Sequence, residues 1–231
     1  MTDPVIEKPV IEKIIKVPAE IQATDALRNA IIEGVIPAGA RITEGDLAGQ
    51  MNLSRATIRS ALTALAGEGL TTLKRYAGWS VISLSGQDIR ELYTLRSALE
   101  RLAARLVAGR VDTGVTEAIT TALADLAREA EGESWVRIAD ADFAFHKTIV
   151  ALSGNSRLIG QYAQLEAQIR MYIRAFDGIG IAAEAIMAPH EAIAAAILRG
   201  DGQQAGQLSE DHNLTDGEML ESHILQLTKA G

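Results

Sequence analysis

The chain has 231 residues, of which 48% are apolar and 23% are charged. This composition is typical of a globular protein and excludes collagen-like, low-complexity and disordered chains. Only 4% of the residues are aromatic, and Ala and Leu dominate the apolar set, which favours helix over strand. The absence of cysteine excludes disulfides, thiolate catalysis and cysteine-ligated metal centres. No apolar run reaches the roughly 18 residues of a membrane span, and the N-terminus lacks a hydrophobic signal core, so we expect a cytoplasmic protein without membrane contact.

The net charge of −8 is unevenly distributed. Residues 1–85 contain nine basic and nine acidic side chains, whereas residues 86–231 contain thirteen basic and twenty-one acidic ones. Within residues 41–75 there are five basic and three acidic side chains. A short basic region can therefore face nucleic-acid phosphates although the chain as a whole is acidic.

The N-terminal part of the chain has the element order of a winged helix-turn-helix. Residues 1–18, interrupted by three prolines, are predicted to form a flexible arm. Residues 19–84 are predicted to form a DNA-binding domain, with Thr43 and Ser54 as helix N-caps and a tight turn at Ala77 and Gly78. The expected elements are helices over residues 19–33, 44–51 and 55–69, and strands over residues 71–74 and 79–83.

From about residue 87 the chain reads as a series of long amphipathic helices separated by glycine-containing breaks. We expect six helices, or seven if Pro189 divides one of them. The predicted fold class is thus mainly α, with a winged helix-turn-helix followed by an all-α bundle. Residues 85–231 are predicted to bind an effector and to mediate dimerisation.

The third predicted helix has the polar side chains that a major-groove helix needs at its N-terminal turn. Arg55 and Arg59 are four residues apart and share one face, and arginine is the usual bidentate partner of guanine. Ser54 and Thr57 can bond to phosphate or to bases. The alternative is that the two arginines are solvated surface residues.

The same stretch resembles the DNA-binding domain of GntR-type transcription regulators over residues 20–83. The resemblance implies DNA contacts by Arg41, Arg55, Arg59 and Gly78, to which we add Thr57 and Arg75. The sequence departs from the family at Ala38 and Thr57, where the family usually has proline; the second change lies at the start of the recognition helix and bears on operator preference. The matching segments are 34–44, Leu47-Ala48, Ser54-Arg55, Arg59 to Leu62, Leu65, Glu68 to Leu70 and Gly78 to Val81.

Four polar residues on three predicted helices are candidates for a metal site. Asp142 and His146 are four residues apart on one helix, and His190 and His212 lie on two others. A carboxylate with three imidazoles is a plausible inward-facing ligand set, and a cation compensates the cost of burying the aspartate. The alternative for each histidine is a core residue with one hydrogen bond, and we assign His223 to that class.

Residues 89–225 also resemble the helical FCD effector domain of FadR-type GntR regulators. In metal-binding members, the residues matching Asp142, His146, His190 and His212 ligate one divalent ion, typically zinc, nickel or manganese. The ligand set does not choose between these ions. The matching segments are Leu95 to Glu100, Ala103 to Leu106, Asp142 to His146, Ser153 to Asn155, His190, Ile193, Ala196-Ile197, Gly200-Asp201 and His212.

A metal ion with open positions can accept an anionic ligand, and an arginine can complete the binding of a carboxylate. Arg96, within an apolar stripe, is the first candidate, followed by Arg170 and Arg174. The alternative for the last two is a salt bridge with Glu100 or Glu166. The resemblance implies a small organic or sugar acid as the effector.

Together these features predict a ligand-responsive repressor that binds a palindromic operator DNA as a homodimer and is not an enzyme. One alternative is a helical metal-dependent hydrolase or lyase that uses the same Asp/His site. Against it, the sequence offers no separate base beside the ligands, because Asp140 is turned by about 200° from Asp142 on a helix. A third possibility is a regulator in which the metal is purely structural and nothing is sensed.

Overall fold

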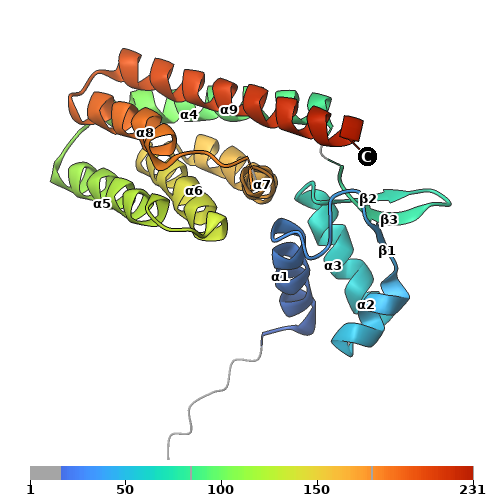
Figure 1. The fold of residues 1–231 in the computed structure, drawn as a ribbon. Helices are drawn as coiled ribbons and strands as arrows, with labels where there is room; N and C mark the ends of the chain where they lie inside the picture. The colour runs from blue at the N-terminus through green and yellow to red at the C-terminus, as the bar shows by residue number, and fades with distance from the viewer. Residues whose placement is uncertain (1–16, 84, 178, 231) are drawn as a thin grey trace, which may run out of the picture.

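The computed structural model describes residues 17–83, 85–177 and 179–230 (Figure 1). The predicted arm lies outside these residues except for positions 17 and 18. The first elements are α1 (Ala19–Ile32), β1 (Arg41–Ile42), α2 (Glu44–Met51), α3 (Arg55–Gly67), β2 (Thr71–Lys74) and β3 (Gly78–Val81). Then come α4 (Gly86–Ala108), α5 (Thr113–Ala130), α6 (Trp135–Leu152), α7 (Ser156–Arg174), α8 (Ala183–Leu198) and α9 (Gly202–Ala230).

This architecture confirms the predicted fold class, a winged helix-turn-helix followed by a helical bundle. The bundle has six helices in the described part of the chain, because Pro189 lies inside α8 and does not divide it. The short strand β1 was not predicted; it pairs antiparallel with β3 and completes a sheet of order β1-β3-β2. No helix in the described residues has the length and apolarity needed to cross a membrane.

The winged helix has its own core, built where α1 and α3 pack together. Ile58, Leu62 and Leu65 lie on one face of α3 and are fully buried, and Ile31 of α1 is also buried. This spacing of three and four residues gives α3 one apolar face and leaves the opposite face to solvent. Arg55 and Arg59, two of the residues expected to reach DNA, are exposed on α3.

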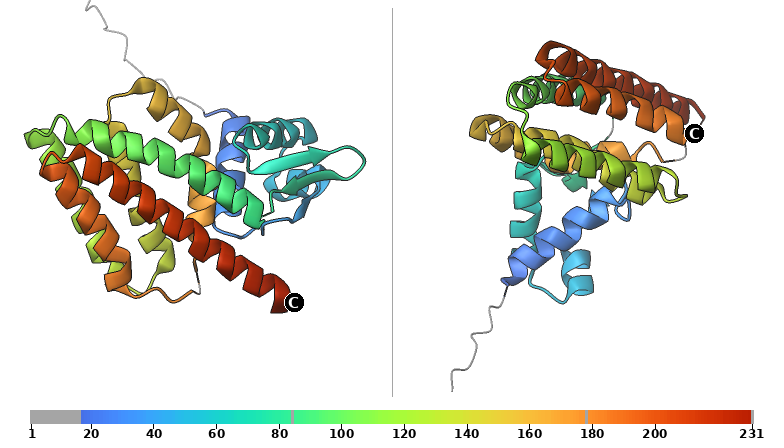
Figure 2. Two further views of the ribbon diagram at one scale, coloured as in Figure 1. Left: turned by 90° about the horizontal axis from the view of Figure 1, so that it is seen from above. Right: turned by 90° about the vertical axis from the view of Figure 1, so that its left-hand side faces the viewer.

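Helices α4 and α9 run antiparallel along one side of the bundle (Figures 1 and 2). Their close approach depends on glycines in α9. A Cβ atom at Gly206 would lie 2.6 Å from Arg105 Cγ, and one at Gly217 would lie 2.8 Å from Tyr93 Cβ. Larger side chains at these two positions would push the helices apart.

Helix α7 is the part of the bundle that lies against the winged helix (Figure 1). The side-chain amide of Gln168 donates a hydrogen bond of 3.2 Å to the backbone oxygen of Glu68, the residue that caps the C-terminal end of α3. Within the winged helix, Arg28 of α1 binds both carboxylate oxygens of Glu68, at 2.6 and 2.7 Å. The end of α3 is therefore held by α1 and contacted by α7.

Candidate DNA interface and candidate metal centre

The N-terminal end of α3 is capped by Ser54, as predicted. The Ser54 hydroxyl accepts a hydrogen bond of 3.0 Å from the Thr57 amide and lies 2.8 Å from the Thr57 hydroxyl. The cap satisfies a free N–H group of the first turn. Arg55 follows directly and is exposed. Thr43, the other predicted N-cap, precedes α2 but makes no side-chain capping bond.

Arg59 is exposed over 67% of its side chain, and Glu44 of α2 binds it. Its Nε and Nη2 atoms donate to the two carboxylate oxygens of Glu44, each at 2.8 Å. The hydrogen bond with Glu44 raises the pKa of the Arg59 guanidinium. Glu44 also accepts a hydrogen bond of 3.0 Å from the indole of Trp79 in β3. One carboxylate thus connects α2, the recognition helix α3 and the sheet.

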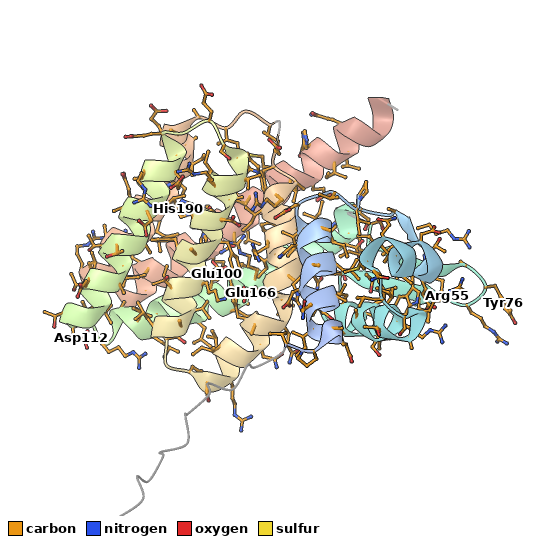
Figure 3. All side chains as sticks on the ribbon, turned by 90° about the horizontal axis from the view of Figure 1, so that it is seen from below. Arg55, Tyr76, Glu100, Asp112, Glu166 and His190 are labelled. Atoms are coloured by element: carbon orange, nitrogen blue, oxygen red, sulfur yellow. The ribbon has the colours of Figure 1, made fainter. Side chains whose placement is uncertain are left out.

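The β2–β3 hairpin projects beyond the rest of the winged helix (Figure 1). Of the predicted DNA contacts, Arg75 lies in its turn and Gly78 begins β3, where its φ of +82° suits glycine. Tyr76, at the tip, is 89% exposed, and the Arg75 guanidinium lies 4.8 Å from the centre of its ring. Arg41, in β1, is exposed on the neighbouring strand. Figure 3 shows Arg55 and Tyr76 on the opposite side of the molecule from His190 of α8.

The four predicted metal ligands come together inside the helical bundle. Asp142 and His146 extend from α6, His190 from α8 and His212 from α9. One ligand atom from each lies within 4.8 Å of all the others. The three imidazoles are buried, with exposed fractions between 1% and 9%.

The inner nitrogen atoms of the three histidines face one another. His146 Nε2 lies 3.1 Å from His190 Nε2 and 3.3 Å from His212 Nε2. The other ring nitrogen of His190 lies 2.7 Å from the Ile186 backbone oxygen, and that of His146 lies 2.7 Å from a Glu100 carboxylate oxygen. Because these oxygens favour a proton on the outer nitrogens, lone pairs are left on the inner ones. A shared cation at the centre of the cluster would satisfy these lone pairs.

The spacing of the cluster also suits such a cation. Asp142 Oδ1, an acceptor, lies 3.0 Å from His190 Nε2. Ligand atoms about 2.0–2.2 Å from one ion are separated from each other by roughly 2.8–3.6 Å, from adjacent octahedral to tetrahedral positions. Three of the separations in the cluster, 3.0–3.3 Å, agree with this, and all four ligand atoms lie within 4.8 Å of one another, so these residues could hold a divalent metal ion.

Acidic and basic groups of the cluster are perturbed by burial and by one another. Burial alone would raise the pKa of Asp142, but the contact with His190 and nearby positive charges together lower it below its usual range. Burial opposes a charged His190, yet the same contact with Asp142 raises its pKa. Burial lowers the pKa of His212 well below its ordinary value, and the neighbouring histidines add to this. His212 is therefore held neutral, which is the form that binds a metal.

A second layer of buried polar groups surrounds His146. Glu100 of α4 accepts hydrogen bonds from Arg96 Nε at 2.7 Å, from the Tyr162 hydroxyl at 2.8 Å and from the Asn213 amide at 2.8 Å. Burial opposes its charge, but Arg96 and His146 hold the pKa of Glu100 well below its ordinary value. Glu100, Tyr162 and Asn213 were not predicted to belong to this site. Only the spacing of Arg96 and Glu100, four residues apart on an apolar face, signals it in the sequence.

The three arginines predicted to bind the effector lie in different surroundings. Arg96 is 1% exposed, and both of its Nη atoms are buried without a hydrogen-bond partner in the described structure. Arg170 and Arg174 instead form ion pairs with Asp140 of α6, at 3.3 and 2.9 Å. The alternative partners expected for them, Glu100 and Glu166, are bound by Arg96 and Lys147. Among the described residues, none of the three arginines lines the cavity beside the cluster.

That cavity has a volume of about 80 Å³ and is lined by three of the four ligands together with apolar side chains. A water molecule takes about 30 Å³ in the liquid, so the space suits a small polar group. Asp216, one turn after His212, also lines it and was not predicted. Burial and the nearby charge of Asp142 raise the pKa of Asp216 to about 7. In the sequence, the position of Asp216 four residues after His212 is the pattern that could have indicated its place beside the cluster.

Two family models match the chain in consecutive segments. Residues 20–81 match the model for bacterial regulatory proteins of the gntR family, and residues 91–215 match the model for the FCD domain. The first segment contains the candidate DNA interface. The second contains all four candidate metal ligands.

Relatives with similar sequences are transcription regulators. The chain is 29% identical over 194 residues to a probable D-xylose utilization operon transcriptional repressor of Paenarthrobacter nicotinovorans, covering 84% of this chain and 83% of that one. It is 31% identical to a gluconate operon transcriptional repressor of Bacillus licheniformis, covering 64% and 60% of the two chains.

Solved structures share the fold. A putative GntR transcriptional regulator from Rhodococcus sp. RHA1 superimposes with a TM-score of 0.73 at 24% identity, covering 87% of this chain and 96% of that one. The E. coli protein McbR/YncC also superimposes with a TM-score of 0.73, at 18% identity, covering 90% and 100% of the chains.

Proposed function

Because the chain belongs to the GntR family of bacterial transcription regulators and contains an FCD domain, we propose that it is a repressor that senses a small carboxylic acid through a metal-containing pocket. Membership of this family decides against the hydrolase or lyase alternative, since its relatives are regulators and not enzymes. We assign residues 19–84 to DNA binding and residues 85–231 to effector binding and dimerisation.

The observation on which the sensing proposal depends is that four possible ligand atoms lie within 4.8 Å of one another inside the bundle. Asp142, His146, His190 and His212 would hold one zinc, nickel or manganese ion per chain. A bound ion neutralises the clustered acceptors and offers open positions to an anionic ligand. The chain's own contribution is to fix the imidazoles through Glu100 and Ile186.

Arg96 is the first candidate to bind the effector carboxylate. Its two unpartnered Nη atoms are the donors that a carboxylate accepts in a bidentate pair. Burying them without a partner is costly, so a ligand that reaches them gains affinity. Arg170 and Arg174 remain secondary candidates, because they would first have to release Asp140. The repressors of D-xylose and gluconate operons among the relatives favour a sugar or organic acid as the effector.

Operator binding is proposed to use two winged helices of a homodimer on a palindromic site. Arg55 and Arg59, with Ser54 and Thr57, would face the major groove, and Arg41, Arg75 and Gly78 would lie along the backbone. Three exposed leucines on one face of α4 support self-association: Leu95, Leu102 and Leu106, exposed over 48%, 42% and 36% of their surface. Spaced seven and four residues apart, they form one stripe.

Metal analysis combined with thermal unfolding tests the proposal. A metal present at about one hundred times its Kd stabilises the fold by about 2.7 kcal/mol, which is roughly 5–10 °C in Tm for a chain of this size. We expect one equivalent of zinc, nickel or manganese per chain by elemental analysis. Acetate, citrate and gluconate are then added to metal-loaded and EDTA-treated protein, and at least one should raise Tm further in the loaded form only. A metal effect without any acid effect would instead favour a purely structural ion.

A further inference from the structure

Helix α7 contacts both the buried polar layer of the metal centre and the end of the recognition helix. Tyr162 makes the first contact and Gln168 the second. The two residues are six positions apart, which is a rise of about 9 Å and a rotation of about 240° on a helix. One side chain therefore points into the bundle, and the other points toward the winged helix.

The inner contact leads to the metal ligands in two steps. The Tyr162 hydroxyl donates to Glu100 Oε1 at 2.8 Å, and the other Glu100 oxygen lies 2.7 Å from His146 Nδ1. All three side chains are buried, with exposed fractions of 2% or less. In a close-packed interior, a small movement of His146 displaces its partners rather than being absorbed by empty space.

The outer contact leads to the end of α3. Gln168 donates to the backbone oxygen of Glu68, and Gly69, with φ of +70°, lies directly against the same amide. A Cβ atom built on Gly69 would lie 2.3 Å from Gln168 Nε2, so a side chain at position 69 would displace the Gln168 amide. Because Arg28 binds the Glu68 side chain, displacing Glu68 also acts on α1. A shift of α7 would therefore move the end of α3 and, through Arg28, helix α1.

We infer that Tyr162 and Gln168 are positioning residues through which occupancy of the metal centre sets the placement of the recognition helix. The inference rests on the proposed function, because its input is metal binding by the Asp/His cluster. Its structural basis is a continuous series of contacts: His146 to Glu100, Glu100 to Tyr162, α7 to Gln168, and Gln168 to the end of α3.

The experiment compares wild type, Tyr162→Phe and Gln168→Leu, each removing one polar contact with little change in shape. Tyr172→Phe and Gln161→Leu are matched controls on the same helix, since Tyr172 is also buried and Gln161 is exposed. Each full-length protein is treated with zinc or with EDTA. We measure bound zinc, amide hydrogen exchange at residues 66–70, and affinity for an operator selected from random DNA.

In the wild type and both controls, zinc should change exchange at residues 66–70 and operator affinity, the latter about five-fold or more, as in typical allosteric coupling. Gln168→Leu, which lies outside the metal site, should bind the same amount of zinc as the wild type and lose both responses. Tyr162→Phe, measured at zinc concentrations that saturate its site, should lose both responses as well. A purely structural role would lower Tm but leave the zinc responses intact. Zinc responses retained in both variants, or absent from a zinc-loaded wild type, would overturn the inference. Failure of the wild type to bind zinc would instead contradict the proposed metal centre itself.

Discussion

The Asp/His cluster and the recognition helix both contain a pair of polar residues four positions apart, but the first pair lies inside the bundle and the second lies on the surface. Asp142 and His146 lie among buried partners that fix the imidazole. Arg55 and Arg59 lie on an exposed face, where only Glu44 holds Arg59. At the cluster, substitutions should therefore affect both folding and binding. Substitution of Arg55 or Arg59 should affect binding alone.

Removal of one buried ligand should have the largest effect. His190→Ala deletes the imidazole that faces both His146 and Asp142, so bound metal should fall from one equivalent per chain to almost none. Elemental analysis after desalting measures this. His223→Ala, which removes the histidine outside the cluster, should retain the full equivalent. Equal stoichiometry in the two variants would show that His190 is not a ligand.

Acidification should release the same ion without a mutation. The pKa of His190 lies above the ordinary imidazole value of about 6.5, so its inner nitrogen takes up a proton as the pH falls through that raised pKa. A protonated imidazole cannot bind a metal, and zinc affinity should then fall roughly tenfold per pH unit for each proton taken up. Competition titrations with a zinc-binding dye between pH 8 and pH 5.5 measure the slope. A constant affinity over this range contradicts the assignment.

Breaking the buried ion pair should destabilise the fold strongly. Glu100→Ala leaves Arg96 buried without its carboxylate, which typically costs about 3–5 kcal/mol. Glu166→Ala breaks an exposed pair with Lys147 and should cost about 0–1 kcal/mol. Urea unfolding of metal-free protein compares the two. Should Glu100→Ala not fold, Glu100→Gln tests the charge alone, and similar costs at positions 100 and 166 would refute the contrast.

At the exposed region, Arg59→Ala should weaken DNA binding without unfolding the protein. Loss of a bidentate contact to guanine corresponds to about 1–3 kcal/mol, or roughly 5- to 150-fold in operator affinity. Gel retardation measures the affinity, and circular dichroism checks the fold. Arg157→Ala removes an equally charged, exposed residue of α7 and should leave operator affinity unchanged. An unaltered Kd for the Arg59 variant would remove this residue from the DNA interface.

The smallest effect is expected at the helix cap. Ser54→Ala removes the hydroxyl that accepts the Thr57 amide proton and should cost about 1 kcal/mol of stability. Thr43→Ala is the comparison, because Thr43 occupies the same position before α2 without a capping bond and should cost less. Urea unfolding separates them. A larger loss at Thr43 than at Ser54 would contradict the observed capping.

Sequence periodicity was sufficient for the fold class and for most element bounds. The helix over residues 44–51 and the strand over residues 71–74 are found where they were predicted, since turn-forming residues flank both. The four polar residues proposed as ligands lie together because each occupies the inward face of its helix. The direction in which a helical side chain points depends on its position within its own helix, so it can be predicted from the spacing of apolar and polar residues.

Which side chains and strands pair with one another could not be predicted from residue spacing. Arg170 and Arg174 pair with Asp140 because of how α6 and α7 pack, a relation between helices that spacing within one helix does not contain. The two-residue strand β1 forms only because β3 offers it an edge. Glu100 gathers side chains from three other helices, and Asn213 and Tyr162 lie far from it in the sequence.

The carboxylate of Glu44 has a consequence for discrimination between DNA sequences. Since Arg59 already has a bidentate partner of ideal length, engaging a base is an exchange of one acceptor for another. On DNA that lacks a suitable guanine, the Arg59 guanidinium would remain bound to Glu44. If Arg59 contacts a base, Glu44 competes with that base for the guanidinium, and the indole of Trp79 holds the carboxylate in place.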